Sequence, residues 1–257
     1  MEKKVFRWVA LLTGLSLVVV LAMNMSFINS PTIEDPPAKD HQGQFRDDYS
    51  IYSLKLPDTL FFAGERVPVD YFDVREDLDR ELLVNTYWQS HTLLLIKRAN
   101  RYLPLIDSIL EEEGVPEDFK YIPLIESELT NAISPAGAVG LWQFLRGTAR
   151  DYGLMIDHQI DERYHVEKST RAAARFFKES YRKYDSWTLA AASFNYGRRN
   201  LSIQMNRQGA DDFYNLILNQ ETARYIYRIL ALKLILNDPV KYGFNIRPQD
   251  LYYPIPS

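Results

Sequence analysis

The chain has 257 residues, carries a formal net charge of −4 and contains no cysteine. Without cysteine it cannot form disulfides, use a catalytic thiol, bind zinc through thiolates or carry the acylated cysteine of a bacterial lipoprotein. The acidic balance is not that of a nucleic-acid-binding protein, and the four histidines lack the spacing of a zinc-protease motif. We therefore expect no metal site and no nucleic-acid partner.

Residues 1–29 have the pattern of a targeting segment. Lys3, Lys4 and Arg7 precede an almost wholly apolar run from Trp8 to Met23, as in a secretory signal peptide or an uncleaved membrane anchor. The run of about 16 residues is short for a span that needs roughly 20, but extension to residue 28 reaches that length. No clear Ala-x-Ala cleavage site follows, which favours the anchor. A buried core helix fits the basic flank poorly.

The next segment, residues 30–80, has the composition of a linker and an extended arm. Residues 30 to about 50 are polar and rich in proline, aspartate and glutamine, which predicts a flexible spacer. Short apolar stretches such as LFFAG and VPVDYF follow between 51 and 80. They predict an extended segment that packs against the main domain.

From about residue 82 the apolar spacing becomes helical, with Leu83, Tyr87, His91 and Leu95 on one face. Further helical stretches are predicted at 117–127, 140–152, 167–184, 186–196 and 221–236. No persuasive strand-type alternation is present in this region. The sequence therefore predicts a mainly α domain over 81–245, followed by a C-terminal tail over 246–257.

One carboxyl group lies on an apolar helix face. Phe119, Ile122 and Glu126 are spaced at i, i+3 and i+7, so they share one side of the predicted helix near its C-terminal end. Burial and the negative end of the helix dipole both raise a carboxyl pKa, as a general acid at neutral pH requires. The alternative is a glutamate that extends to water or pairs with an arginine. Glu128 is predicted to be a solvated surface residue.

Two stretches of small residues flank this candidate acid in the sequence. In SPAGAVGLWQ, residues 134–143, the absence of side-chain bulk would let a polymer approach the backbone, although an ordinary turn before a helix fits equally. In AAASFNYG, residues 190–197, Asn195 could present an amide to a ligand. Alternatively, Asn195 ends a helix, with Gly197 beyond it.

Taken together and in order, these stretches resemble the catalytic domain of the family 1 lytic transglycosylases, a helical lysozyme-like (SLT) fold. Within that family the likeness is to the membrane-bound lytic murein transglycosylase D group, and it is dense from about 85 to 236. The matching segments are YWQSHTLLLIKRANRYLPLI, GVPEDFKYIPLIES, GAVGLWQF, DER, STRAAARFF, SWTLAAASFNYG and ETARYIYRIL. Several spaced motifs in one order argue against chance similarity.

The resemblance implies a site of five residues. Glu126, in the Glu-Ser motif, takes the place of the catalytic acid and base, and Ser127 helps to place the substrate or the carboxyl. Gln143 matches a glutamine that lines the cleft, and Asn195 matches the asparagine of an Ala-Tyr-Asn motif. Tyr225 matches a tyrosine that approaches the catalytic carboxyl.

The chain also departs from the family pattern. Phe194 stands where the family has the tyrosine of Ala-Tyr-Asn, so a hydroxyl is lost. Leu145 and Arg146 replace a common Met-Pro, and His165 and Val166 replace a common Asp-Pro. Longer relatives carry wall-binding LysM repeats after the catalytic domain, and we expect none in this chain.

The activity implied by the resemblance is cleavage of the MurNAc-GlcNAc β-1,4 bond of peptidoglycan, with formation of 1,6-anhydro-MurNAc ends and without any cofactor. The implied location is the periplasm or cell envelope, where residues 1–29 would hold an uncleaved chain in the inner membrane. Two alternatives stay open. One is a muramidase that uses water, and the other is a catalytically silent wall-binding protein.

Overall fold

The computed structural model describes residues 51–256, which begin with a short antiparallel hairpin and continue mainly as helices. In the hairpin, β1 (Leu60–Phe62) pairs with β2 (Glu65–Val67), with Leu60 opposite Val67. The α-helices are α3 (Phe72–Tyr87), α4 (Gln89–Glu112), α5 (Ile122–Ser127), α6 (Arg146–Asp151), α7 (Val166–Tyr184), α8 (Trp187–Tyr196), α9 (Arg198–Gln208) and α10 (Gln220–Asn237). The 3-10 helices are η1 (Glu117–Tyr121), η2 (Glu162–Tyr164), η3 (Phe213–Asn215), η4 (Val240–Tyr242) and η5 (Pro248–Asp250).

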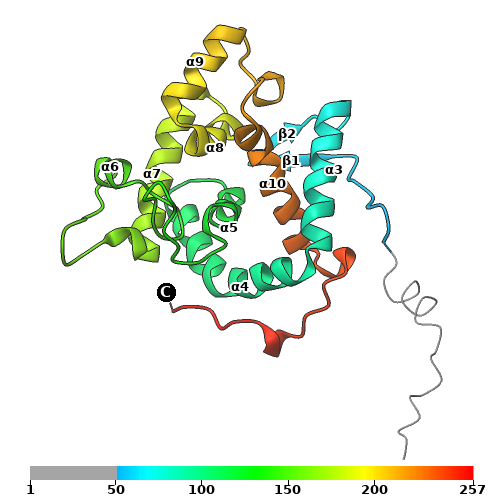
Figure 1. Cartoon of the computed structure of the whole chain (residues 1–257), viewed down its shortest axis with the longest axis horizontal. Helices are drawn as coiled ribbons and strands as arrows, with labels where there is room; N and C mark the ends of the chain where they lie inside the picture. Colours follow the sequence, from blue (N-terminus) through cyan, green and yellow to red (C-terminus); the bar gives the residue numbers. More distant parts are fainter. Residues whose placement is uncertain (1–50, 257) are drawn as a thin grey trace, which may run out of the picture. The chain divides into compact units, whose positions relative to one another are not determined.

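The short helix α5 lies inside a ring formed by α4, α7, α8 and α10 (Figure 1). Helix α10 packs against α3, α5 and α8, and α7 packs against α4 and α8. Close contact between α7 and α8 follows from their small side chains, because residues 172–174 and 190–192 are all buried alanines. The longer helices therefore form a rigid frame around α5.

The hairpin is fastened to the start of α8 by one carboxylate. Glu65 accepts hydrogen bonds from the Ser186 hydroxyl (3.0 Å), the Thr188 amide (2.9 Å) and the Thr188 hydroxyl (2.6 Å), and also from the Trp187 amide. A negative charge at a helix N-terminus satisfies amides that have no partner within the helix. Glu65 therefore fixes the first turn of α8, the helix whose last turn carries Asn195.

The predicted helices at 167–184, 186–196 and 221–236 match α7, α8 and α10 to within a residue or two. The helix predicted at 140–152 is confined to α6, because Gly140 and Gln143 have positive φ angles that interrupt a helix. Helical structure also starts earlier than expected, at Phe72, so only part of 51–80 is extended. Helix α9 was not predicted, since Leu201 is its single buried residue.

The expected membrane segment at 1–29 and the spacer at 30–50 lie outside the described residues. Within residues 51–256, no helix has the length and apolar character needed to cross a bilayer.

The Glu65 contact gives a stability prediction. Replacing Glu65 with alanine should lower the free energy of unfolding by about 2–3 kcal/mol, because it removes a charged acceptor from several donors. Urea denaturation measures this loss. Glu76→Ala, on the exposed surface of α3, is the matched control and should change stability by less than about 0.5 kcal/mol. Equal stability of the two variants would contradict the role assigned to Glu65.

Candidate active site

Glu126 lies in the last turn of α5, where the chain changes direction. Pro123 stands in the first turn of this six-residue helix, and the helix ends because Glu128 and Leu129 both take left-handed conformations with φ of 54°. Ile122 and Leu124 are buried in the core. The apolar residues therefore hold α5 in place and leave Glu126 on the side that lines a cleft.

The Glu126 carboxyl is held by Tyr225 from α10. The Tyr225 hydroxyl donates a hydrogen bond of 2.6 Å to Oε1 of Glu126. Burial, together with the neighbouring Glu126 carboxyl, raises the pKa of Tyr225 well above its usual range. The phenol therefore stays protonated and acts as a permanent donor to one carboxyl oxygen.

The surroundings of Glu126 favour its neutral form. Loss of hydration among crowded protein atoms raises the pKa of Glu126 to about 7, and the negative charge of Glu221 adds to this effect. The hydrogen bond from Tyr225 and the positive charge of Arg228 act in the opposite direction. Desolvation is the largest contribution, so a substantial fraction of Glu126 carries a proton at neutral pH, as general acid catalysis requires.

The cleft beside Glu126 has a volume of about 570 Å³, within the usual range for ligand-binding clefts. Its walls come from α5, the loop between α5 and α6, the end of α8 and the start of α10. Four of the five predicted site residues line it, namely Glu126, Gln143, Asn195 and Tyr225. Within residues 51–256, no group of three or more histidine, aspartate or glutamate side chains is arranged to hold a metal ion.

Gln143 is held rigidly across its own loop. It has a left-handed backbone with φ of 48°, and its Nε2 donates to the carbonyl oxygens of Ala132 (3.0 Å) and Gly140 (2.8 Å). Both contacts use the amide nitrogen. The amide oxygen makes no hydrogen bond among the described residues, which leaves an acceptor available at the cleft wall.

Arg163, the arginine of the Asp-Glu-Arg motif, anchors the same loop from beneath. Its buried guanidinium donates to the carbonyl oxygens of Gly137 and Phe144, each at 3.0 Å, and pairs with Asp161 at 2.7 Å. Gly140 passes so close that a Cβ there would lie 2.1 Å from the Arg163 carbonyl oxygen. Glycine is therefore required at position 140 because two backbone segments of this chain pass close together there, and not because a polymer must approach the backbone.

Asn195 joins the end of α8 to the start of α10. Its Nδ2 donates to Glu221 at 3.1 Å, and its Oδ1 accepts from the Thr222 hydroxyl at 2.8 Å. Asn195 lies in the last turn of α8, and the C-cap itself is Gly197 with φ of 81°. The amide is therefore a fixed part of the cleft wall.

The ring of Phe194 is part of an aromatic cluster under the cleft. It lies 5.0–5.5 Å, between ring centroids, from Phe144, Phe176 and Phe177. The ring edges therefore meet other aromatic groups, an arrangement in which phenylalanine packs well without a hydroxyl.

Ser127 is adjacent to Glu126 in the sequence but does not line the cleft. Its buried hydroxyl donates to the Leu141 carbonyl oxygen at 2.8 Å and lies 3.2 Å from that of Pro123. It ties the end of α5 to the loop that carries Gln143. Of the two roles implied by the resemblance, placing the carboxyl fits these contacts, and direct contact with substrate does not.

Comparison with known proteins agrees with this architecture. The family described as the transglycosylase SLT domain matches residues 105–217. These residues of the chain are therefore similar to the transglycosylase SLT domain family. The matched segment contains Glu126, Gln143 and Asn195, while Tyr225 lies just beyond it.

Two curated relatives are similar to parts of this chain. The chain is 32% identical to the membrane-bound lytic murein transglycosylase D of Escherichia coli K12 over 183 residues, which cover 69% of this chain and 40% of that protein. It is 34% identical over 113 residues to a putative tributyltin chloride resistance protein of Alteromonas sp. strain M-1, covering 43% of this chain and 55% of that one. The chain thus spans between two fifths and just over half of the length of these relatives.

The charged residues Glu221 and Arg228 also line the cleft, and the sequence did not predict them. With Tyr225 they are spaced at i, i+4 and i+7, which places all three on one face of α10. This spacing is visible in the sequence, but the family resemblance implies a role for Tyr225 only. Glu128 was expected to be only solvated, and although exposed it is paired with His91 (3.1 Å) and Arg98 (3.6 Å).

The raised pKa of Glu126 predicts a pH-dependent effect on stability. At pH 4 the side chain is neutral in both the folded and unfolded states, so Glu126→Gln should match the wild type. As pH rises from 4.5 to 7 the folded wild type retains a proton that its unfolded state has lost, and its relative stability falls. Above pH 8, Glu126→Gln should be more stable by on the order of 2–4 kcal/mol.

Denaturant unfolding at pH 4 and pH 8 measures this difference. Glu76→Gln, at an exposed position on α3, is the control and should show no growth of the difference with pH. A Glu126→Gln effect that is the same at both pH values would show that the carboxyl titrates normally.

Proposed function

We propose that this chain cleaves the MurNAc-GlcNAc β-1,4 bond of peptidoglycan by intramolecular ring closure. The observation that carries the proposal is the Glu126 carboxyl, whose pKa is raised to about 7 and which is held by Tyr225 in a cleft of the SLT-like domain. The E. coli relative is named as a lytic murein transglycosylase, which supports peptidoglycan as the substrate here.

In the proposed reaction, Glu126 first donates its proton to the glycosidic oxygen, and the bond from C1 of MurNAc to that oxygen breaks. The C6 hydroxyl of the same MurNAc then forms a bond to C1, and its proton passes to the Glu126 carboxylate. Glu126 is thereby restored, and the product is a 1,6-anhydro end formed without water. A pKa near the working pH suits a group that gives and takes a proton in one cycle.

A tethered nucleophile explains why one carboxyl suffices. Most glycosidases use a pair of carboxyl groups, because a second one activates water or attacks the sugar. In ring closure the attacking hydroxyl belongs to the substrate, and such tethering can lower a barrier by about 7–11 kcal/mol in favourable cases. In the proposal, Gln143 and Asn195 line the bound sugar, and Ser127 secures the helix that carries Glu126.

Hydrolysis is the competing function, and one observation favours considering it. Glu221 is a second carboxylate on the wall of the same cleft, where a hydrolase could use it to activate water. In our proposal Glu221 instead accepts the Asn195 amide and keeps that side chain in place. The two functions therefore differ in what they require of Glu221.

The location follows from the substrate. We propose that the domain works in the periplasm or cell envelope, with residues 30 to about 50 as a spacer and residues 1–29 as a signal or membrane anchor.

Mass spectrometry of digested peptidoglycan sacculi tests the proposed function. The wild type should release fragments with anhydro ends, which lack the mass of one water. Glu126→Gln should reduce release by about 10²–10⁴-fold, whereas Glu221→Gln should give the same anhydro product and lose less than about tenfold in rate.

Each alternative predicts a different result. Reducing ends alone would establish hydrolysis and contradict ring closure. Lysis by Glu126→Gln at the wild-type rate would show that the wrong residue has been assigned.

A further inference from the structure

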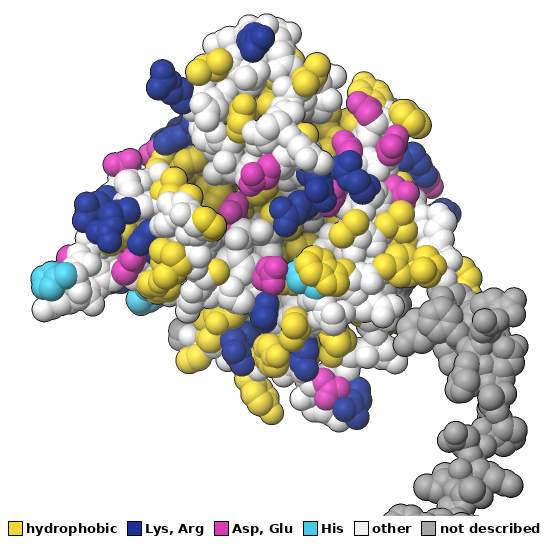
Figure 2. Space-filling model, in the orientation of Figure 1, with side chains coloured by type: hydrophobic (Ala, Val, Ile, Leu, Met, Phe, Trp, Pro, Cys, Tyr) yellow, Lys and Arg dark blue, Asp and Glu magenta, His cyan; other side chains and the backbone are white. Residues whose placement is uncertain are grey.

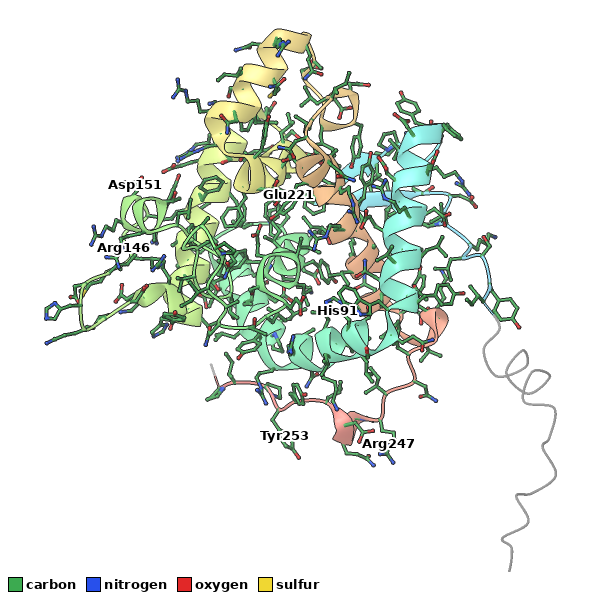
Figure 3. The ribbon with its side chains drawn as sticks, viewed as in Figure 1. His91, Arg146, Asp151, Glu221, Arg247 and Tyr253 are labelled. Atoms are coloured by element: carbon green, nitrogen blue, oxygen red, sulfur yellow. The ribbon has the colours of Figure 1, made fainter. Side chains whose placement is uncertain are left out.

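A second hollow adjoins the cleft on the side of α3 and α4. It has a volume of about 380 Å³ and shares Ile125, Glu221 and Arg228 with the cleft as common wall residues. His91 and Glu221, labelled in Figure 3, both line it. Figure 2 shows acidic and basic side chains gathered along the centre of this face. The two hollows therefore lie next to each other, one on each side of these shared residues.

An exposed tryptophan stands at the far side of this second hollow. Trp88 lies between α3 and α4, and its ring is stacked on that of His91 with a centroid distance of 3.9 Å and an interplanar angle of 11°. Even so, 56% of Trp88 is exposed. His91 supports one face of the indole, and more than half of Trp88 remains open to solvent.

The support beneath Trp88 is itself fixed to α5. His91 lies 3.1 Å, through Nε2, from Oε1 of Glu128, only two residues after Glu126. The Arg98 guanidinium donates a hydrogen bond of 3.1 Å to the backbone carbonyl oxygen of Glu128 and lies 3.6 Å from the Glu128 carboxylate. The position of the indole is therefore coupled to the helix that carries the acid, although Trp88 is on the surface.

Several charged residues line the hollow beside apolar ones such as Leu95 and Ile125. Arg224 makes a two-point ion pair with the buried Glu81, at 2.6 and 3.1 Å, which fixes the position of the guanidinium. Arg228 makes no hydrogen bond or ion pair among the described residues and lies between the two hollows. A flat apolar ring beside a few fixed polar groups suits a pyranose, because its C–H face stacks on the ring while its hydroxyls reach the polar groups.

We propose that Trp88 is a sugar-binding platform that holds the glycan strand at a distance from the bond cleaved beside Glu126. The inference rests on the proposed function, since a polymer of sugars is the ligand that would occupy the cleft and the adjoining hollow together. Its consequence is a preference for long strands. A short oligomer can occupy the cleft alone, whereas a longer one also gains the contact with Trp88.

Binding of peptide-free glycan oligomers of four and eight sugars, prepared from amidase-treated walls, tests the platform. Calorimetric titration of Glu126→Gln protein avoids cleavage during the measurement. Eight sugars should bind more tightly than four, and adding Trp88→Ala should reduce that advantage about tenfold while leaving four-sugar binding unchanged. Trp88→Phe, which keeps a smaller ring, should retain part of the advantage and also covers the case in which the alanine variant fails to fold.

Tyr253→Ala removes another exposed aromatic ring, 84% exposed on the C-terminal tail, and should change neither affinity. Equal affinities with and without the Trp88 ring would overturn the proposal, and so would an equal loss for both oligomers. These outcomes are separate from failure of the proposed function, because wild-type protein that releases no anhydro product would refute ring closure whatever the binding to Trp88.

Discussion

The chemistry of this molecule depends on one physical constraint, the cost of ionising a carboxyl group that has lost most of its hydration. Protein atoms crowd Glu126 from α5, α8 and α10, and this desolvation outweighs the opposing effects of Tyr225 and Arg228. The balance leaves a carboxyl that can both donate and accept a proton near neutrality. A stronger positive field would leave Glu126 charged and unable to donate, and deeper burial would hold its proton too tightly for the donation step.

Much of the surrounding structure keeps that balance in place through contacts far from Glu126 itself. Glu65 fixes the first turn of α8, so that Asn195 in its last turn meets α10. Arg163 anchors the loop of Gln143 through two carbonyl oxygens, and Ser127 ties the same loop to α5. Each cleft wall is thus fastened by a buried or partly buried polar contact, which suits a site whose groups must be positioned before the substrate arrives.

The sequence predicted the parts that depend on local spacing and on motif order. The helices α7, α8 and α10 follow from periodicity, and Glu126 and Tyr225 are singled out by the family resemblance. The helix predicted over 117–127 is instead the 3-10 helix η1 followed by α5. The left-handed backbone of Gln143 could not be predicted, because it is imposed by the anchoring of its loop rather than by residue preference. The contact of Glu65 with α8 joins residues more than 120 positions apart, and the exposure of Trp88 depends on how α3 meets α4. Local pattern carries no information on such pairings.

The central claim is that Glu126 carries its proton up to neutral pH, and a direct titration tests it best. Carbon NMR of protein labelled at the glutamate side-chain carboxyls follows each group separately, and Glu126 is assigned as the signal missing from Glu126→Gln. The account predicts a midpoint at about pH 7, well above the ordinary value of 4.5. A midpoint close to 4.5 would mean that the carboxyl is already ionised at neutral pH, and the proposed acid-and-base cycle would then have no proton to begin with.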